Sequence, residues 1–251
     1  MNLYNLLCLI QFILNVLGSH SGWRTIEMLA EQHPYVVAIL NQTKDYVCTG
    51  TILDETTVLT SGGCINPKPH YVAVGTAVFN NKITNTIFSI SRTKLHEDYN
   101  FGVQSDLNIS HMQNNIGLVF IAQPVLKLFL ENAVVGVYYA PELREKKLVM
   151  VGFGNTEKSE TNVLQQQDYY QTGCVNPTWY YCICGIEYSN ITYQESFGEG
   201  APVLFNNVVV AIAATPAGSL TMKTNINYNI FTIIAPYLTW IEKSKIRSSA
   251  N

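Results

Sequence analysis

Short apolar segments recur along the chain and are separated by polar stretches that contain glycine, asparagine or proline. Each segment is of strand length, and no long segment with the period of a helix interrupts them. β-Branched and aromatic residues outweigh Ala, Glu and Lys, which also favours strands. The pattern predicts an all-β barrel or sandwich, with strands in YVVAIL, TTVLT, HYVAVG, NTIFSI, IGLVFI, KLVMVGFG, VVVAIAA and YNIFTII.

The C-terminal stretch APYLTWIEKSKI departs from this pattern. Tyr237, Trp240 and Ile241 follow helical spacing, and Pro236 suits the first turn of a helix. Two lysines close the stretch, where the helix dipole favours cations. We therefore predict a helix at about 236–246.

The bulk composition excludes some partners. The chain has 251 residues, of which 47% are hydrophobic and 13% charged, with a formal net charge of −3. It can bury a sizeable core, and it has no basic excess that would indicate nucleic-acid binding. The polar segment APELREKK at 140–147 is a plausible connector between two halves, at about 34–138 and 148–235.

The N-terminal residues predict export. An apolar run from Leu6 to Leu17 is too short to span a bilayer, and small residues follow it. We interpret residues 1–18 as a signal peptide, and no later segment predicts a membrane span, so the protein is expected to be secreted and extracellular. Three sequons agree with export and are candidate glycosylation sites: Asn41, Asn108 and Asn190.

Several motifs, taken in order, resemble one family. CTGTILDETTVLTSGGC at 48–64 is similar to the CGGxLI…VLTAAHC segment of the chymotrypsin/trypsin-like serine proteases. LHEDYN, NNIGLVFI, VGFGNT, FGEGAP and YLTWIEK are similar to that family's HPxYN, NDIALIKL, VxGWGxT, GDSGGP and YxxWI motifs. The resemblance covers nearly the whole mature chain and implies two six-stranded antiparallel β-barrels with a C-terminal helix.

The same resemblance implies a degenerate catalytic triad. The family's mechanism needs a serine whose proton is taken by a histidine that a buried aspartate orients. The histidine position falls on Gly63, the aspartate position on Asn115 and the serine position on Glu199. None of the three side chains can play its part in that mechanism, so no catalytic residue is expected. Among the remaining histidines only His111 is near the cleft by sequence, and we interpret it as a loop residue.

The supporting residues have changed as well. The glycine of the oxyanion hole falls on Phe197, and the aspartate that receives the new N-terminus falls on Gly198. The segment that pairs with substrate falls on 214–216, where Pro216 lacks the N–H of a strand ladder. The base of the specificity pocket falls near Tyr193. We expect neither activation by cleavage nor a tryptic pocket.

Five cysteines remain in the mature chain, which is an odd number in an oxidising compartment. The resemblance implies a bond between Cys48 and Cys64, and a second bond from Cys174 to either Cys182 or Cys184. Strand alternation cannot choose between those two, since they share a face, and the following Gly185 favours Cys184. The cysteine left over is either buried or available for a disulfide-linked partner.

These observations predict a secreted, non-catalytic serine protease homologue of arthropod type, with no cofactor and no metal. The resemblance implies binding to other secreted proteins, such as proteases or their substrates, in an immune or proteolytic cascade or in a reproductive-tract secretion. Two alternatives are a weak hydrolase that uses relocated residues, and a secreted product without a function. The sequence does not name the partner or the tissue.

Overall fold

A computed structural model describes most of the chain. The described residues are 29–75, 78–79, 87–103, 109–125, 131–155, 162–174, 179–187, 196–214 and 228–246. The expected signal peptide therefore lies outside them, as do Asn108, Asn190, Tyr193 and Pro216.

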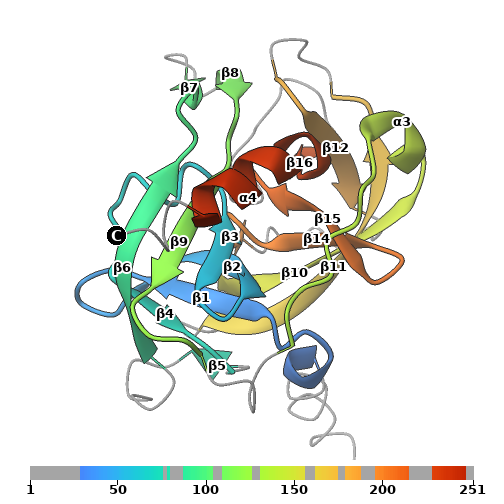
Figure 1. The fold of residues 1–251 in the computed structure, drawn as a ribbon. Coiled ribbons are helices and arrows are strands. Elements are labelled where there is room, and N and C mark those ends of the chain that lie inside the picture. Colours follow the sequence, from blue (N-terminus) through green and yellow to red (C-terminus); the bar gives the residue numbers. More distant parts are fainter. Residues whose placement is uncertain are drawn as a thin grey trace, which may run out of the picture.

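The first half of the chain forms a closed antiparallel barrel (Figure 1). Around the barrel its strands are β1 (Val36–Leu40), β2 (Tyr46–Asp54), β3 (Thr57–Thr60), β9 (Gly117–Ile121), β6 (Ile87–Leu95) and β4 (Tyr71–Ala73).

The second half closes in the same way, because β10 pairs with both β14 and β11. Its six strands, in order around the barrel, are β10 (Lys147–Asn155), β14 (Pro202–Phe205), β15 (Val208–Ala213), β16 (Tyr228–Ile233), β12 (Cys182–Glu187) and β11 (Asn162–Thr172). The all-β fold with two six-stranded barrels is thus confirmed.

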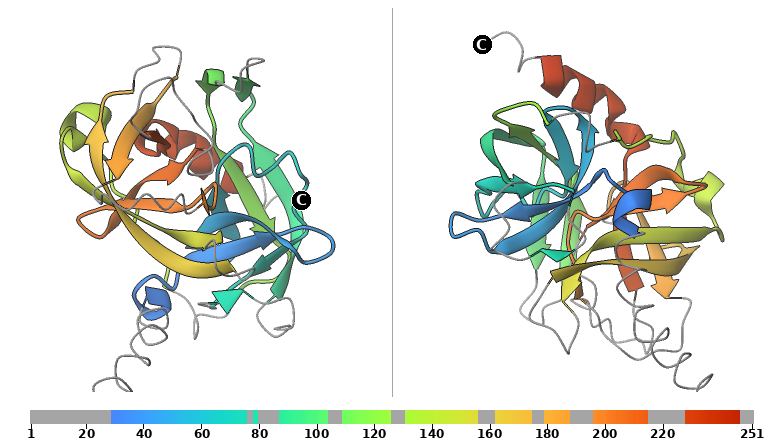
Figure 2. Two further views of the ribbon diagram at one scale, coloured as in Figure 1. Left: turned by 180° about the vertical axis from the view of Figure 1, so that it is seen from behind. Right: turned by 90° about the horizontal axis from the view of Figure 1, so that it is seen from below.

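Short elements complete the described fold. β5 (Val78–Phe79) and β13 (Ser196–Phe197) extend the second sheet, and β7 (Asn100–Val103) pairs with β8 (Ile109–Gln113) as a separate hairpin. The helices are α3 (Ala140–Leu143), the 3₁₀ turn η2 (Ala235–Tyr237) and α4 (Leu238–Ile246). The C-terminal helix lies where its spacing predicted it, and Figure 2 shows it beside both barrels. No helix among the described residues is long and apolar enough to cross a membrane.

The continuous apolar runs are explained by burial of both strand faces. In β1, Val37 and Ile39 belong to the core of the first barrel, whereas Val36, Ala38 and Leu40 belong to a cluster shared with the second barrel. Alternate side chains of a strand point to opposite faces, so both faces of this strand are apolar because each meets a core. The shared cluster holds the two barrels together.

Two backbone hydrogen bonds show where the linker between the two barrels lies. The N–H of Ala133 donates to the carbonyl of Ile52 in the first barrel, and the N–H of Gly136 donates to the carbonyl of Val209 in the second. The polar segment 140–147 follows this linker, and its helix α3 buries Leu143 in the core of the second barrel.

Candidate functional site

Gly63, Asn115 and Glu199, which the resemblance places at the triad positions, lie together between the two barrels. The N–H of Gly63 donates to Oδ1 of Asn115 at 3.1 Å. On its other side Gly63 faces Glu199, and a Cβ built at Gly63 would overlap Oε1 of that residue. The space that a side chain at residue 63 would fill is therefore taken by the Glu199 carboxylate.

Ser61, which sequence reasoning passed over, holds that carboxylate. Its hydroxyl donates to Oε1 of Glu199 and accepts a hydrogen bond from the N–H of Cys64 at 3.4 Å. Ser61 is fully buried. The only feature of the sequence that could have pointed to Ser61 is its place two residues before Gly63.

The backbone next to Glu199 is fixed as well. The N–H of Thr49 donates to the carbonyl of Glu199 at 2.9 Å. The next residue, Gly200, has a φ of +83°, and a Cβ there would overlap the carbonyl oxygen of Thr49. Only glycine adopts this conformation and this approach without strain, so the turn that presents Glu199 depends on Gly200.

Burial controls the charge of Glu199. The residue is partly exposed, but its carboxyl group lies against Gly63 and the buried Ser61, and it acts electrostatically on the hydroxyl groups of Tyr46 and Tyr99. Desolvation raises the pKa of Glu199 to about 7, and the hydrogen bond from Ser61 opposes this shift. No cation pairs with Glu199 among the described residues. This carboxyl group therefore keeps its proton to a higher pH than an exposed glutamate does.

Asn115 is held as an amide. Its Nδ2 donates to the carbonyl of Ala214 at 2.7 Å and contacts Sδ of Met112 at 3.3 Å. Its Oδ1 accepts from Gly63, so both ends of the amide have partners at this buried position. A carboxylate has no hydrogen for the Ala214 carbonyl, so the site suits asparagine better than aspartate.

Two disulfides are formed, and the partner of Cys174, which the resemblance left open between Cys182 and Cys184, is Cys184. Cys48 and Cys64 are joined with a Cα–Cα distance of 6.0 Å, and Cys174 is joined to Cys184 at 5.0 Å. Cys182 is free and half-buried, with Sγ 3.3 Å from the carbonyl of Tyr180. Burial raises the pKa of the Cys182 thiol to about 12, so it is a poor nucleophile at neutral pH.

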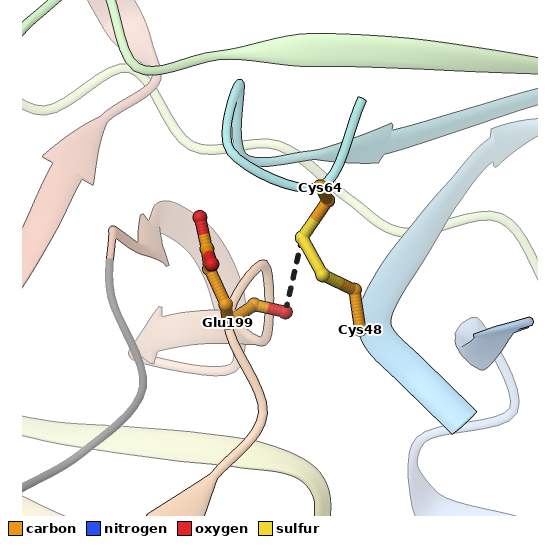
Figure 3. A group of neighbouring side chains, drawn as sticks. All are labelled: Cys48, Cys64 and Glu199. Carbon is orange, nitrogen blue, oxygen red and sulfur yellow. Dashed lines mark hydrogen bonds between the residues drawn. A yellow bond between two sulfur atoms is a disulfide. The ribbon is translucent and has the colours of Figure 1, made fainter. Parts of the chain in front are cut away.

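Glu199 also lies against the first disulfide (Figure 3). Its carbonyl oxygen is 3.6 Å from Sγ of Cys64, a packing contact, since a disulfide sulfur carries no hydrogen. Cys48, Cys64 and Glu199 place their possible ligand atoms within 4.8 Å of one another. Because the two sulfurs are bonded to each other, they are not thiolates, and the group does not fit a metal ion.

The described histidines are engaged away from Glu199. His111, on β8, contacts Oδ1 of Asn100 at 2.9 Å and Oγ of Ser110 at 3.0 Å. His33 contacts the hydroxyl of Tyr35 at 2.9 Å. His96 packs against Trp240, and His70 packs against Tyr71. None of these four is a base for Ser61 or Glu199 in the described part of the chain.

The residues just before Glu199, and the sequon residue Asn41, are held by the strands of the two barrels and by a turn between strands. Phe197 pairs with Gly154 in the β13–β10 ladder, and the N–H of Gly198 donates to the carbonyl of Phe153 at 2.8 Å. The sequon residue Asn41 lies in the turn between β1 and β2, where its Oδ1 accepts from the N–H groups of Thr43 and Asp45.

Comparisons with known proteins agree with this fold. The model of the trypsin family matches residues 24–241. A trypsin of Sarcophaga bullata is 27% identical over 103 residues, which are 40% of this chain and 37% of that protein. The chain is thus aligned to little more than a third of the length of this curated relative.

Two solved structures share the fold. Neuropsin, a serine protease of mouse brain, has a TM-score of 0.67 at 15% identity, covering 85% of this chain and 95% of that one. HL collagenase has a TM-score of 0.64 at 18% identity, with coverages of 85% and 94%. Because the family model covers most of the described barrels and the site between them, the chain belongs to the trypsin family.

Proposed function

We propose that this protein is a secreted, non-catalytic serine protease homologue that acts by binding other proteins. It would serve as a regulator or cofactor in extracellular fluid, either in an immune or proteolytic cascade or in a reproductive-tract secretion. The observation that carries the proposal is the Glu199 carboxylate in the space next to Gly63.

The chemistry supports this conclusion. Acyl transfer in this family needs a nucleophile, a base beside it and an orienting group. Gly63 has no side chain that could take a proton, Asn115 is neutral, and Glu199 donates no nucleophilic hydroxyl. Ser61 does contact a carboxylate, but it is fully buried, so a substrate carbonyl has no approach to it.

The surroundings fit a scaffold whose site is used for contact and not for turnover. Both barrels, the disulfide from Cys48 to Cys64 and the turn at Gly200 are intact. A fold with its frame kept and its chemistry replaced is well suited to protein binding. The short apolar N-terminus, the sequons and the disulfides support secretion. The likeness to a trypsin of Sarcophaga bullata agrees with an arthropod-type homologue.

The decisive experiment treats the purified mature protein with a fluorophosphonate probe and with peptide esters, beside active trypsin. We expect no labelling and no hydrolysis. Stoichiometric labelling would contradict the proposal and favour the alternative, a weak hydrolase with relocated residues. The variant Ser61→Ala then decides whether Ser61 is that nucleophile.

Binding is tested separately. The secreted protein is cross-linked in its own fluid, the partner is identified, and the purified pair is titrated. A saturable complex between the two purified proteins supports the proposal. Failure of every cross-linked candidate to bind after purification would contradict it and favour a product without a function.

A further inference from the structure

A groove away from Glu199 is left unused by the proposed function. Its volume is about 880 Å³, within the usual range for sites of small molecules. One wall is the segment from Gln32 to Tyr35, the second is the linker from Glu131 to Val134, and the third is the β14–β15 turn. Figure 2 (right) shows the short helical turn at 29–32, in blue, beside the orange strands of the second barrel.

The polar lining of the groove is dominated by amides. The side chains of the five amide residues form no hydrogen bond with the described part of the chain, so their donors and acceptors are available to a ligand. These residues are Gln32, Asn132, Gln166, Asn206 and Asn207.

The charges in the groove balance. The charged lining residues are Glu131 and Lys147, of opposite sign. Lys147 pairs with Asp168 at 2.6 Å, which further reduces its field. The groove therefore selects neither an anion nor a cation, and its chemistry favours a neutral, polar ligand.

The floor is apolar and is formed by paired strands. Val149 of β10 pairs directly with Leu204 of β14, and Phe205 of β14 pairs with Val208 of β15. An extended peptide binds best by adding to an unpaired edge, and Val149 and Leu204 in the floor offer none because each is paired on both sides. At this part of the floor, hydrogen bonds to a ligand come from side chains.

The walls of the groove are preorganised by hydrogen bonds and by turn geometry. Asn206 and Asn207 have φ values of +51° and +61°, those of a tight hairpin turn. The linker is tied to β15 by the N–H of Val209, which donates to the carbonyl of Val134 at 2.8 Å. The first wall is braced by the 2.9 Å contact between His33 and Tyr35. Preorganised walls lower the entropic cost of binding.

We propose that this groove binds a neutral oligosaccharide. Amide side chains both donate to and accept from sugar hydroxyls, and the apolar floor with Phe205, beside Tyr35 of the first wall, suits the C–H faces of sugar rings. The site is independent of the degenerate triad, so its ligand neither requires nor tests the loss of proteolysis.

The test measures binding of three neutral probes to the full mature protein by titration calorimetry: N-acetylated chitohexaose, maltohexaose and an oligomannose. We expect at least one to bind saturably, and Gln166→Ala and Asn132→Ala each to weaken it by about three- to tenfold, the loss of one neutral hydrogen bond. Gln113→Ala, an amide on β8 outside the groove, should leave the affinity unchanged.

Two results would overturn the proposal. One is the absence of binding by all three probes at millimolar concentration in a protein whose cooperative unfolding shows that it is folded. The other is binding that the groove variants and Gln113→Ala affect equally. Binding of extended peptides in place of the sugars would assign the groove to a protein partner and also contradict the proposal.

Discussion

The Glu199 carboxylate occupies the space that a side chain at Gly63 would need, so the two residues are complementary in volume. A side chain added at residue 63 is accommodated only if the side chain at residue 199 becomes smaller.

Gly63→Ala should therefore destabilise the protein by about 1–3 kcal/mol, the usual cost of overpacking. The double variant Gly63→Ala, Glu199→Ala should lose less than the sum of the two single changes, because the added methyl group then has room. Urea unfolding measures both effects. Gly173→Ala is the matched control, since a Cβ there meets nothing within 4 Å. Additive losses at 63 and 199 would show that the two side chains do not compete.

Asn115→Asp should also destabilise, by about 1–3 kcal/mol, because the Ala214 carbonyl loses its donor and meets a second oxygen. The loss should shrink at acid pH, where the new carboxyl group is protonated and can donate. Thermal unfolding at several pH values tests this, with the exposed Asn132→Asp as control. A loss that does not change with pH would contradict the proposed contact.

Stability should depend on the titration of Glu199. Its pKa is raised from 4.5 to about 7, so the folded state binds a proton that the unfolded state has released. The stabilising contribution is thus fully present below pH 4.5 and is lost as the pH rises towards and through 7, on the order of 3 kcal/mol in total.

Glu199→Gln keeps the shape and an acceptor for Ser61 but has no proton to lose. The free energy of unfolding from urea titrations, measured from pH 4.5 to 8, should fall less steeply for this variant than for the wild type. Parallel curves for the two proteins would show that Glu199 is not the titrating group.

Cys182 should remain a free, slowly reacting thiol. Its raised pKa leaves almost no thiolate at pH 7.5, so a maleimide should label the native mature protein slowly and the denatured protein with one equivalent. Cys182→Ser should remove this labelling and leave the mobility on non-reducing gels unchanged. A reducible dimer or adduct that Cys182→Ser abolishes would instead assign this cysteine to a covalent partner.

Much of the fold could be predicted from the sequence because many of its strands are mostly apolar. Each of the apolar segments named at the outset contains a strand, from β1 to β16. β11 could not be found in this way, since NVLQQQDYYQT carries three glutamines and an aspartate in its centre. It is a strand because its backbone pairs with β10 over eight positions, from Lys147–Tyr170 to Gly154–Val163. Pairing with a distant strand overrides local preference.

For the candidate site too, the sequence determined some features and the tertiary structure determined others. The identities of Gly63, Asn115 and Glu199 can be read from the sequence, and so can the expectation that, at the positions the resemblance assigns to the triad, they offer no proton acceptor, orienting charge or hydroxyl nucleophile. The tertiary structure decided how those residues are used: the hydrogen bonds from Ser61 to Glu199, Gly63 to Asn115 and Asn115 to Ala214 join positions 138, 52 and 99 residues apart. The contact between Gly63 and Asn115 forms within the first barrel, whereas those of Glu199 and Ala214 form only when the two barrels pack together. The desolvation that raises the pKa of Glu199 arises from the same packing.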